Sequence, residues 1–191
     1  MTAPKSVWLG PDFFARDAKV VARALLGKAL VTSHGKTVSS HTITETEAYV
    51  GPHDLASHSA RGRTNRNAPM FGPPGTLYIY RIYGLHWMLN VVTGEVGYPA
   101  AVLIRSVEAI TGPGRLTRDL EITDRLNGKM ASRQAGLGFV DRGDRIASRR
   151  ILRTARIGVA YAGDIWAAKE YRFVLLPDAV LRGPRAKAAK G

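Results

Sequence analysis

The chain has 191 residues, 45% of them hydrophobic and 23% charged, a composition that fits one globular domain with a full apolar core and excludes a disordered chain. It has no cysteine, which excludes a disulfide framework, a thiolate nucleophile and cysteine-ligated zinc or iron–sulfur centres. The 28 Lys and Arg residues outnumber the 15 Asp and Glu residues, and the net charge of +13 favours a polyanionic partner such as nucleic acid over a merely basic surface.

The first predicted element is an amphipathic helix over residues 11–26. Its apolar side chains recur at helical spacings, Asp12 or Asp17 can cap its start, and Gly27 can end it. Residues 28–33 and 41–50 are rich in β-branched side chains and predict two strands joined by a turn.

Two carboxylates stand out on the second of these strands. Glu45 and Glu47 should project to the same side of the strand, because side chains alternate between the two faces. Residues 51–75 contain four prolines and no sustained period, which predicts a long irregular loop of the kind that is usually functional. Residues 76–94 predict two strands around a turn at Tyr83 and Gly84, and residues 100–110 predict a third, giving a three-stranded antiparallel unit.

The remaining elements complete the predicted fold. A short helix should begin near Pro113, and residues 171–176 should form a closing strand. The basic residues 182–191 predict a flexible tail. We therefore expect a single α+β domain over residues 1–191, with a curved antiparallel β-sheet, surrounding helices and a protruding β-hairpin near Tyr83.

The sequence shows no signal for membrane insertion or secretion. No run approaches the roughly 18 apolar residues of a membrane helix, and residues 1–14 lack the charged-then-apolar order of a signal peptide. We expect an intracellular protein without membrane contact, cytoplasmic and nucleoid-associated if it is bacterial.

Glu47 is the first candidate for chemistry. A carboxylate that faces inward from a strand must be paired or have a task, because burying it alone is very costly. Beside a bound substrate it can take a proton from water. From spacing alone, an ordinary ion pair with an arginine on a neighbouring strand is an equally good interpretation.

Aromatic side chains cluster around this acid in the sequence. Tyr49 follows Glu47 at strand spacing, and Tyr78 and Tyr80 share a face of another strand, so their rings could stack on unpaired bases or simply pack in a core. Tyr83 lies at a predicted hairpin tip, where a large ring is better placed to wedge between base pairs than to pack inside.

Metal and nucleotide sites are poorly supported. His53 and His58 flank Asp54 but lack the order of the helical HExxH motif, so we expect no metal. Neither glycine-rich stretch, 72–76 or 112–117, has the P-loop pattern, although Arg115 and the helix start could contact a single phosphate.

Several blocks then occur in a jointly specific order: ETEAY at 45–49, His58, PGTLYIYRIYG at 74–84, the asparagine of WMLN, VLIR at 102–105 and RIGVAYAG at 156–163. With them the chain resembles the alkyladenine DNA glycosylase family, the alkyl-purine type of 3-methyladenine DNA glycosylase. The resemblance runs from about Leu9 to Leu175.

The resemblance implies a role for each matching residue. Glu47 would be the general base that activates water, and Arg105 would help to hold that water. The flipped purine would lie between Tyr49, His58 and Tyr80, while Asn90 would crowd its 2-position and disfavour guanine. Tyr83 would fill the gap left in the duplex. Phosphate contacts are expected from Arg61, Arg63, Arg66 and Arg115.

The resemblance further implies a monofunctional glycosylase of base excision repair that acts as a monomer on double-stranded DNA, with no cofactor. Expected substrates are 3-methyladenine, 7-methylguanine, hypoxanthine and ethenoadenine. One departure is a short connection, because Ile110 is followed at once by Thr111 and Gly112 where the family commonly has some twenty further residues. Two alternatives stay open: a glycosylase that attacks with a lysine amine, and a non-catalytic basic protein that binds damaged DNA.

Overall fold

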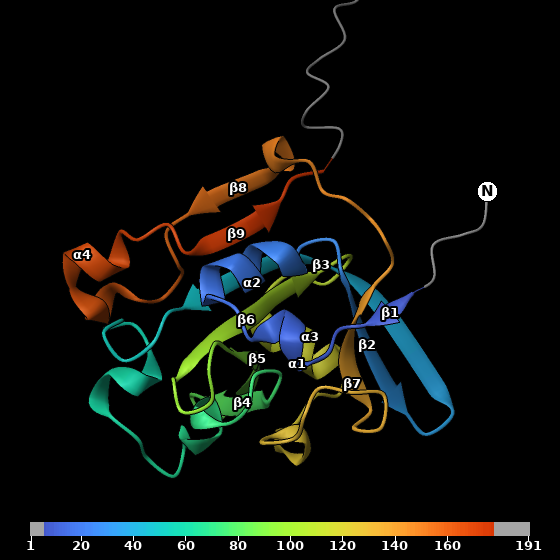
Figure 1. Cartoon of the computed structure of the whole chain (residues 1–191), viewed down its shortest axis with the longest axis horizontal. Helices are drawn as coiled ribbons and strands as arrows, with labels where there is room; N and C mark the ends of the chain where they lie inside the picture. Colours follow the sequence, from blue (N-terminus) through green and yellow to red (C-terminus); the bar gives the residue numbers. More distant parts are fainter. Residues whose placement is uncertain (1–5, 178–191) are drawn as a thin grey trace, which may run out of the picture.

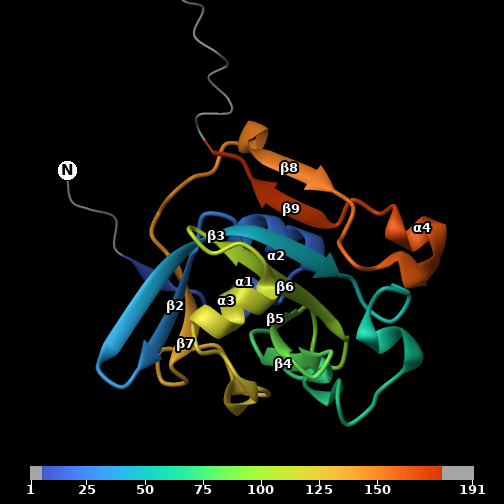
Figure 2. The same cartoon turned by 180° about the vertical axis from the view of Figure 1, so that it is seen from behind.

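An open antiparallel sheet organises residues 6–177, the part of the chain that the computed structural model describes (Figures 1 and 2). Its main strand order is β1-β7-β2-β3-β6-β5-β4, while β9 pairs with both β3 and β8. The strands are β1 (Val7–Trp8), β2 (Ala29–His34), β3 (Thr37–Tyr49), β4 (Leu77–Ile82), β5 (His86–Thr93), β6 (Ala100–Val107), β7 (Leu137–Asp141), β8 (Ile151–Thr154) and β9 (Arg172–Leu175). The predicted tail at 182–191 lies outside the described residues.

The helices of the described chain are short. The α-helices are α1 (Pro11–Phe14), α2 (Ala18–Leu25), α3 (Pro113–Asp119) and α4 (Gly163–Ala167). The 3₁₀ helices are η1 (His58–Arg61), η2 (Ala68–Phe71), η3 (Asp124–Leu126), η4 (Ser148–Arg150) and η5 (Ala160–Ala162). Within residues 6–177, no helix has the length and apolar character needed to cross a membrane.

The single helix predicted over residues 11–26 is wrong, because the chain forms two helices there. Asp17 has extended backbone angles (φ −49°, ψ 137°) and its carboxylate accepts hydrogen bonds from the backbone N–H groups of Lys19 and Val20. A residue that caps a helix in this way cannot also continue a preceding one. Asp17 therefore starts α2 and separates it from α1.

The long strand β3 joins the two halves of the sheet. Its first half pairs with β2, and its second half pairs with β6 on one side and β9 on the other. The β3–β6 ladder shifts register on both sides of Glu45. Such shifts bend a strand and re-aim its side chains, and this one lies immediately before Glu47.

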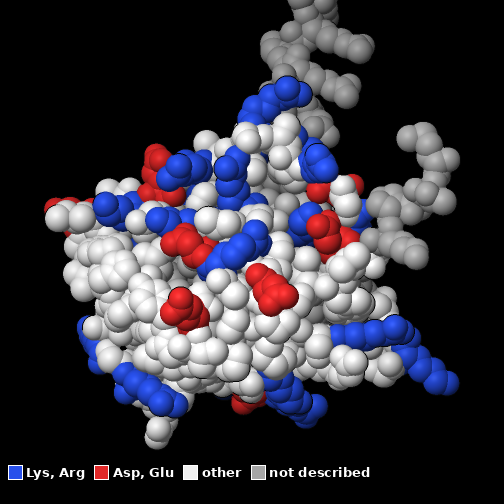
Figure 3. All heavy atoms as spheres, viewed as in Figure 1, with Lys and Arg blue, Asp and Glu red and all other residues white. Residues whose placement is uncertain are grey.

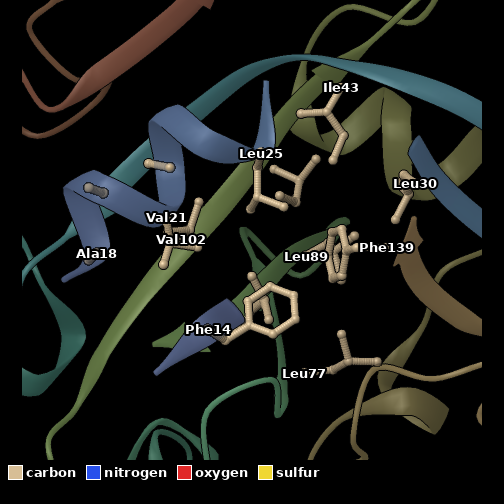
Figure 4. Packing of buried hydrophobic residues seen from close by; sticks show 14 of the residues in the cluster. Phe14, Ala18, Val21, Leu25, Leu30, Ile43, Leu77, Leu89, Val102 and Phe139 are labelled. Atoms are coloured by element: carbon tan, nitrogen blue, oxygen red, sulfur yellow. The ribbon is translucent and has the colours of Figure 1, made fainter. Parts of the chain in front are cut away.

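The two faces of the sheet differ in β4, β5 and β6: one face joins the main hydrophobic core, and the other carries a smaller cluster. Side chains alternate between faces along a strand, and directly opposite residues in antiparallel strands share a face. One alternate set joins the main hydrophobic core with α2, as Figure 4 shows; it comprises Leu77, Ile79, Leu89, Val91, Val102 and Ile104. The other set includes Tyr78, Val92 and Ala101, which form a smaller cluster with Met70.

The predicted strands and the second predicted helix are confirmed at the level of element type. β4 and β5 pair in antiparallel register through a turn at Tyr83, and β9 occupies the predicted closing segment. Leu116, Leu120 and Ile122 are buried, as expected for α3 and the residues after it. The strands β1, β7 and β8 and the helix α4 had no counterpart among the predicted elements.

Truncating Leu25, a core side chain of α2, should destabilise the protein. Leu25 is fully buried against the sheet, so Leu25→Ala should lower the free energy of unfolding by about 2–5 kcal/mol. Val20, on the same helix, is 49% exposed, so Val20→Ala should change it by less than about 0.5 kcal/mol. Urea unfolding of both variants tests this, and equal losses would show that α2 does not pack as described.

Candidate active site

A row of side chains crosses four adjacent strands on the face opposite the main core. Glu47 of β3 lies opposite Leu103 of β6, which lies opposite Asn90 of β5, which lies opposite Tyr78 of β4. Because directly opposite residues share a face, the sheet places the acid, the amide and the ring on one surface. Tyr49 and Tyr80, two positions along β3 and β4, point to the same side.

Glu47 is fully buried and receives three polar contacts. Its Oε1 accepts a hydrogen bond from the backbone N–H of Ile157 at 2.8 Å and lies 3.3 Å from Nη1 of Arg105. Its Oε2 accepts a hydrogen bond from the hydroxyl of Tyr49 at 3.0 Å. Burial nevertheless raises the pKa of the Glu47 carboxyl above its ordinary value, because loss of hydration outweighs these three stabilising contacts.

Glu45 has the opposite character, although it lies only two residues away. Its carboxylate accepts hydrogen bonds from Ser106 Oγ at 2.6 Å, Arg105 Nε at 3.0 Å and Arg172 Nε at 2.6 Å. Burial alone would raise its pKa, but the bonds from Ser106 and Arg172 and the charge of Arg105 hold the pKa below its ordinary value. Glu45 is therefore a fixed anion that aligns Arg105 between the two carboxylates.

An aromatic pocket lies beside this acid cluster. It is a small cavity that is partly open to solvent. Its lining includes four residues that the sequence nominated for a base pocket, together with Tyr78, Tyr161 and smaller side chains; the four are Tyr49, His58, Tyr80 and Asn90. Glu47 and Arg105 lie outside the lining, and Tyr49 connects the two parts because it lines the cavity and bonds Glu47.

The pocket side chains hold one another in place. His58 Nδ1 lies 2.9 Å from the Tyr78 hydroxyl, and its ring meets the Tyr80 ring edge-on at 4.4 Å between centroids. Burial, aided by the positive charge of Arg66, lowers the pKa of His58 and favours the neutral imidazole. Burial also raises the pKa of Tyr78 to about 12, so this phenol keeps its proton at neutral pH.

The Asn90 amide is oriented by the backbone. Its Nδ2 donates to the carbonyls of Tyr78 at 3.1 Å and Met88 at 3.3 Å. Because both amide hydrogens are engaged, the side chain is held rigidly at the pocket wall.

The predicted loop over residues 51–75 is confirmed as irregular, with η1 and η2 as its regular turns. Asn67 holds its fold, since Nδ2 donates to the carbonyls of His58 at 3.0 Å and Gly62 at 2.9 Å. Asp54 is fully buried and forms a two-pronged ion pair with Arg156. Asp54 therefore has a structural role as the partner of a buried guanidinium.

The nominated DNA-contacting residues lie at the surface. Tyr83 is 89% exposed and has a left-handed backbone (φ 49°), and the side chains of Arg61, Arg63, Arg66 and Arg115 are also exposed. Arg66 donates to the carbonyl of Arg81 at 2.7 Å and lies over the Tyr80 ring. Among residues 6–177, no group of three or more His, Cys, Asp or Glu side chains could hold a metal ion.

Comparison with known proteins decides the family. The model of the Methylpurine-DNA glycosylase (MPG) family matches residues 12–112 and 107–178. A protein of Myxococcus xanthus (strain DK1622) named "Putative 3-methyladenine DNA glycosylase" is 43% identical, over 93% of this chain and 95% of its own. One of the same name from Anaeromyxobacter dehalogenans (strain 2CP-C) is 46% identical, over 90% of this chain and 85% of its own.

The chain belongs to the methylpurine-DNA glycosylase family. It is therefore a DNA glycosylase, and the resemblance read from the sequence is confirmed. The two matched parts overlap at residues 107–112, the position of the short connection after Ile110.

Several residues of the candidate site in this methylpurine-DNA glycosylase were not nominated from the sequence. Tyr161 lines the pocket and donates its hydroxyl to the carbonyl of Ala56 at 2.8 Å. From the same segment, Ile157 donates its N–H to Glu47 and Arg156 pairs with Asp54. Their one sequence signal was the RIGVAYAG block. Nothing in that block alone indicates that it bonds to β3, more than a hundred residues earlier.

The raised pKa of Glu47 has a consequence for stability. The folded protein holds this proton more tightly than the unfolded chain, so the associated stability is full below the ordinary pKa and is lost as pH rises through the folded value. Gln cannot ionise. The stability of Glu47→Gln relative to wild type should therefore be higher at about pH 8 than at about pH 4.5.

Urea unfolding at both pH values measures this difference. The exposed Glu95 supplies the matched control, Glu95→Gln, which should differ from wild type equally at the two pH values. A pH-independent difference for Glu47→Gln as well would contradict the raised pKa.

Proposed function

We propose that the chain is a monofunctional DNA glycosylase of base excision repair that flips a damaged purine from duplex DNA and releases it by attack of a Glu47-activated water. The observation that carries this proposal is the contact between the buried Glu47 carboxylate and Tyr49, because it joins a proton acceptor to the wall of an aromatic pocket. The partner is double-stranded DNA, bound by a monomer without a cofactor.

The proposed reaction is hydrolysis of the N-glycosidic bond. The bond between C1′ and the purine nitrogen breaks, its electron pair leaves with the base, and the water oxygen bonds to C1′ while its proton passes to Glu47. Positive charge develops on the sugar in the transition state, and a nearby carboxylate stabilises it. Arg105, held by Glu45, would orient the water at the same carboxylate.

The pocket suits flat and electron-poor bases. Tyr49 and Tyr80 line the cavity and would stack on a flipped purine, and an N3-alkylated adenine carries a positive charge that such rings favour. Hypoxanthine and ethenoadenine are neutral and would depend on stacking and on a hydrogen bond with neutral His58. Asn90, fixed by its two backbone bonds, would crowd the purine 2-position and so disfavour guanine.

Binding to the duplex would use the exposed groups. Tyr83, at the turn of a hairpin that we propose protrudes into the minor groove, would fill the space left by the flipped base. Arg61, Arg63, Arg66 and Arg115 are exposed and would contact phosphates. Figure 3 shows one face on which Lys and Arg gather over α2, β8 and β9 with acids among them, so the positive charge is not confined to these four residues.

Replacing the proposed base tests the function. Glu47→Gln should bind a duplex with one 3-methyladenine analogue or one ethenoadenine as wild type does, yet excise about 10²- to 10⁴-fold more slowly. Single-turnover release of abasic sites measures the rate, and a gel shift measures the binding. Excision at the wild-type rate would remove Glu47 from the mechanism, while a borohydride-trapped adduct in wild type would indicate lysine attack instead.

Replacing the proposed wedge tests base flipping. Tyr83→Ser should weaken binding to a lesion duplex by about 5- to 150-fold, since stacking on one base is worth roughly 1–3 kcal/mol. Val38 is similarly exposed but lies on the β2–β3 hairpin, so Val38→Ser should leave affinity unchanged. Equal affinities for the two variants would argue against a wedge at Tyr83.

A further inference from the structure

A buried ion pair behind the pocket has no part in the function proposed so far. Arg156 and Asp54 have fully buried side chains, and the bond is two-pronged: Nη1 to Oδ2 at 2.5 Å and Nη2 to Oδ1 at 2.8 Å. Two parallel bonds between a guanidinium and a carboxylate fix orientation as well as distance. The pair is therefore a rigid unit inside the protein.

This unit clamps three segments of the chain together. Arg156 Nη1 also donates to the carbonyl of Ala48, the residue between Glu47 and Tyr49, at 2.9 Å. Asp54 accepts hydrogen bonds from the backbone N–H groups of Val50 at 3.2 Å and Ala56 at 3.1 Å. The end of β3, the start of the pocket loop and the segment that contains Arg156 are joined at one point.

The same guanidinium lies against a pocket wall. Its central carbon is 4.8 Å from the centroid of the Tyr49 ring and 5.3 Å from that of Tyr171. The planar cation thus supports Tyr49, whose hydroxyl bonds Glu47 Oε2. The next residue along the chain, Ile157, donates its N–H to Glu47 Oε1 at 2.8 Å. Each oxygen of the carboxylate therefore has a donor held in place by Arg156.

We propose that Arg156, fixed by Asp54, is a positioning residue for excision, because it aims the Ile157 N–H and the Tyr49 hydroxyl at the two oxygens of Glu47. The proposal rests on the proposed role of Glu47. Arg156 itself touches neither the water nor the base in this scheme, and it acts through the two donors.

The chemistry of arginine suits this task better than that of lysine. The contacts require a group that bonds two carboxylate oxygens and a carbonyl while it lies against an aromatic ring. An ammonium keeps the charge and can pair with Asp54, but it cannot reproduce that fork. Arg156→Lys should therefore loosen the two donors without leaving Asp54 unpaired.

The proposal is tested through the pH dependence of the excision rate, which reports the pKa of Glu47. Several other groups also affect this pKa. Facing or influencing its carboxylate are Arg105 of β6, Glu45 and Tyr49 of β3, Tyr80 of β4, and Arg156 and Tyr161 of the segment after β8. All except Arg156 are unchanged in the variant. The Ile157 N–H lowers the pKa of Glu47, so weakening that bond should move the acid limb of the rate profile to higher pH.

The experiment compares Arg156→Lys with Arg153→Lys, an exposed arginine three residues earlier. Single-turnover excision from one lesion duplex is measured between about pH 4.5 and pH 8, with affinity and thermal unfolding of each variant. We expect Arg156→Lys to bind normally, to excise about 10- to 100-fold more slowly, and to show the shifted acid limb. Arg153→Lys should match wild type.

Each other outcome also decides the matter. A rate and acid limb like those of Arg153→Lys would overturn the proposal, as would a slower rate that only follows a loss of folded protein without a shifted limb. If Arg156→Lys does not fold, Ile157 is replaced by its α-hydroxy acid, which puts an ester oxygen in place of the N–H donor and leaves every side chain unchanged. A shifted limb then supports the proposal, and an unshifted one overturns it. An active Glu47→Gln in the same assay would instead indicate failure of the proposed function.

Discussion

A carboxylate withdrawn from water is the constraint around which this structure is arranged. Burying an ionised carboxyl group is costly unless donors replace its hydration. Glu47 has donors from three directions: the backbone of Ile157, the hydroxyl of Tyr49 and the guanidinium of Arg105. They do not compensate fully, since the pKa of Glu47 stays raised. A raised pKa is what a general base needs, because an ordinary carboxylate is too weak a base for water.

The two neighbouring glutamates show how the environment separates roles. Glu45 and Glu47 lie two residues apart on one strand, yet the pKa of one is lowered and that of the other is raised. Glu45 is bonded by two arginines and a serine, and so serves as a permanent anion that positions Arg105. The register shift on both sides of Glu45 lies within the β3–β6 ladder, where this cluster forms. One strand thus supplies both a structural charge and a candidate base.

The sequence predicts those parts of the site that follow from local periodicity. Residues two apart on β3 and β4 share a face, so the acid and the tyrosines could be placed before their neighbours were known. The split of the first helix was missed because apolar residues keep a helical spacing on both sides of Asp17, and the pattern alone does not decide whether Asp12 or Asp17 caps a helix. The clamp was missed for a different reason. Ile157 lies 110 residues from Glu47 and Arg156 lies 102 from Asp54, so no spacing rule connects them.

The charge balance within the site differs from that of the whole chain. Glu45, Glu47 and Asp54 are matched by Arg105, Arg156 and Arg172 in direct ion pairs. These six groups cancel, so the net charge of +13 belongs to the rest of the molecule. A distributed positive charge attracts a phosphate backbone without regard to sequence, whereas a locally neutral site imposes no strong preference for anions near the reacting sugar. Attraction to DNA and the chemistry of the candidate site can therefore be set by different residues.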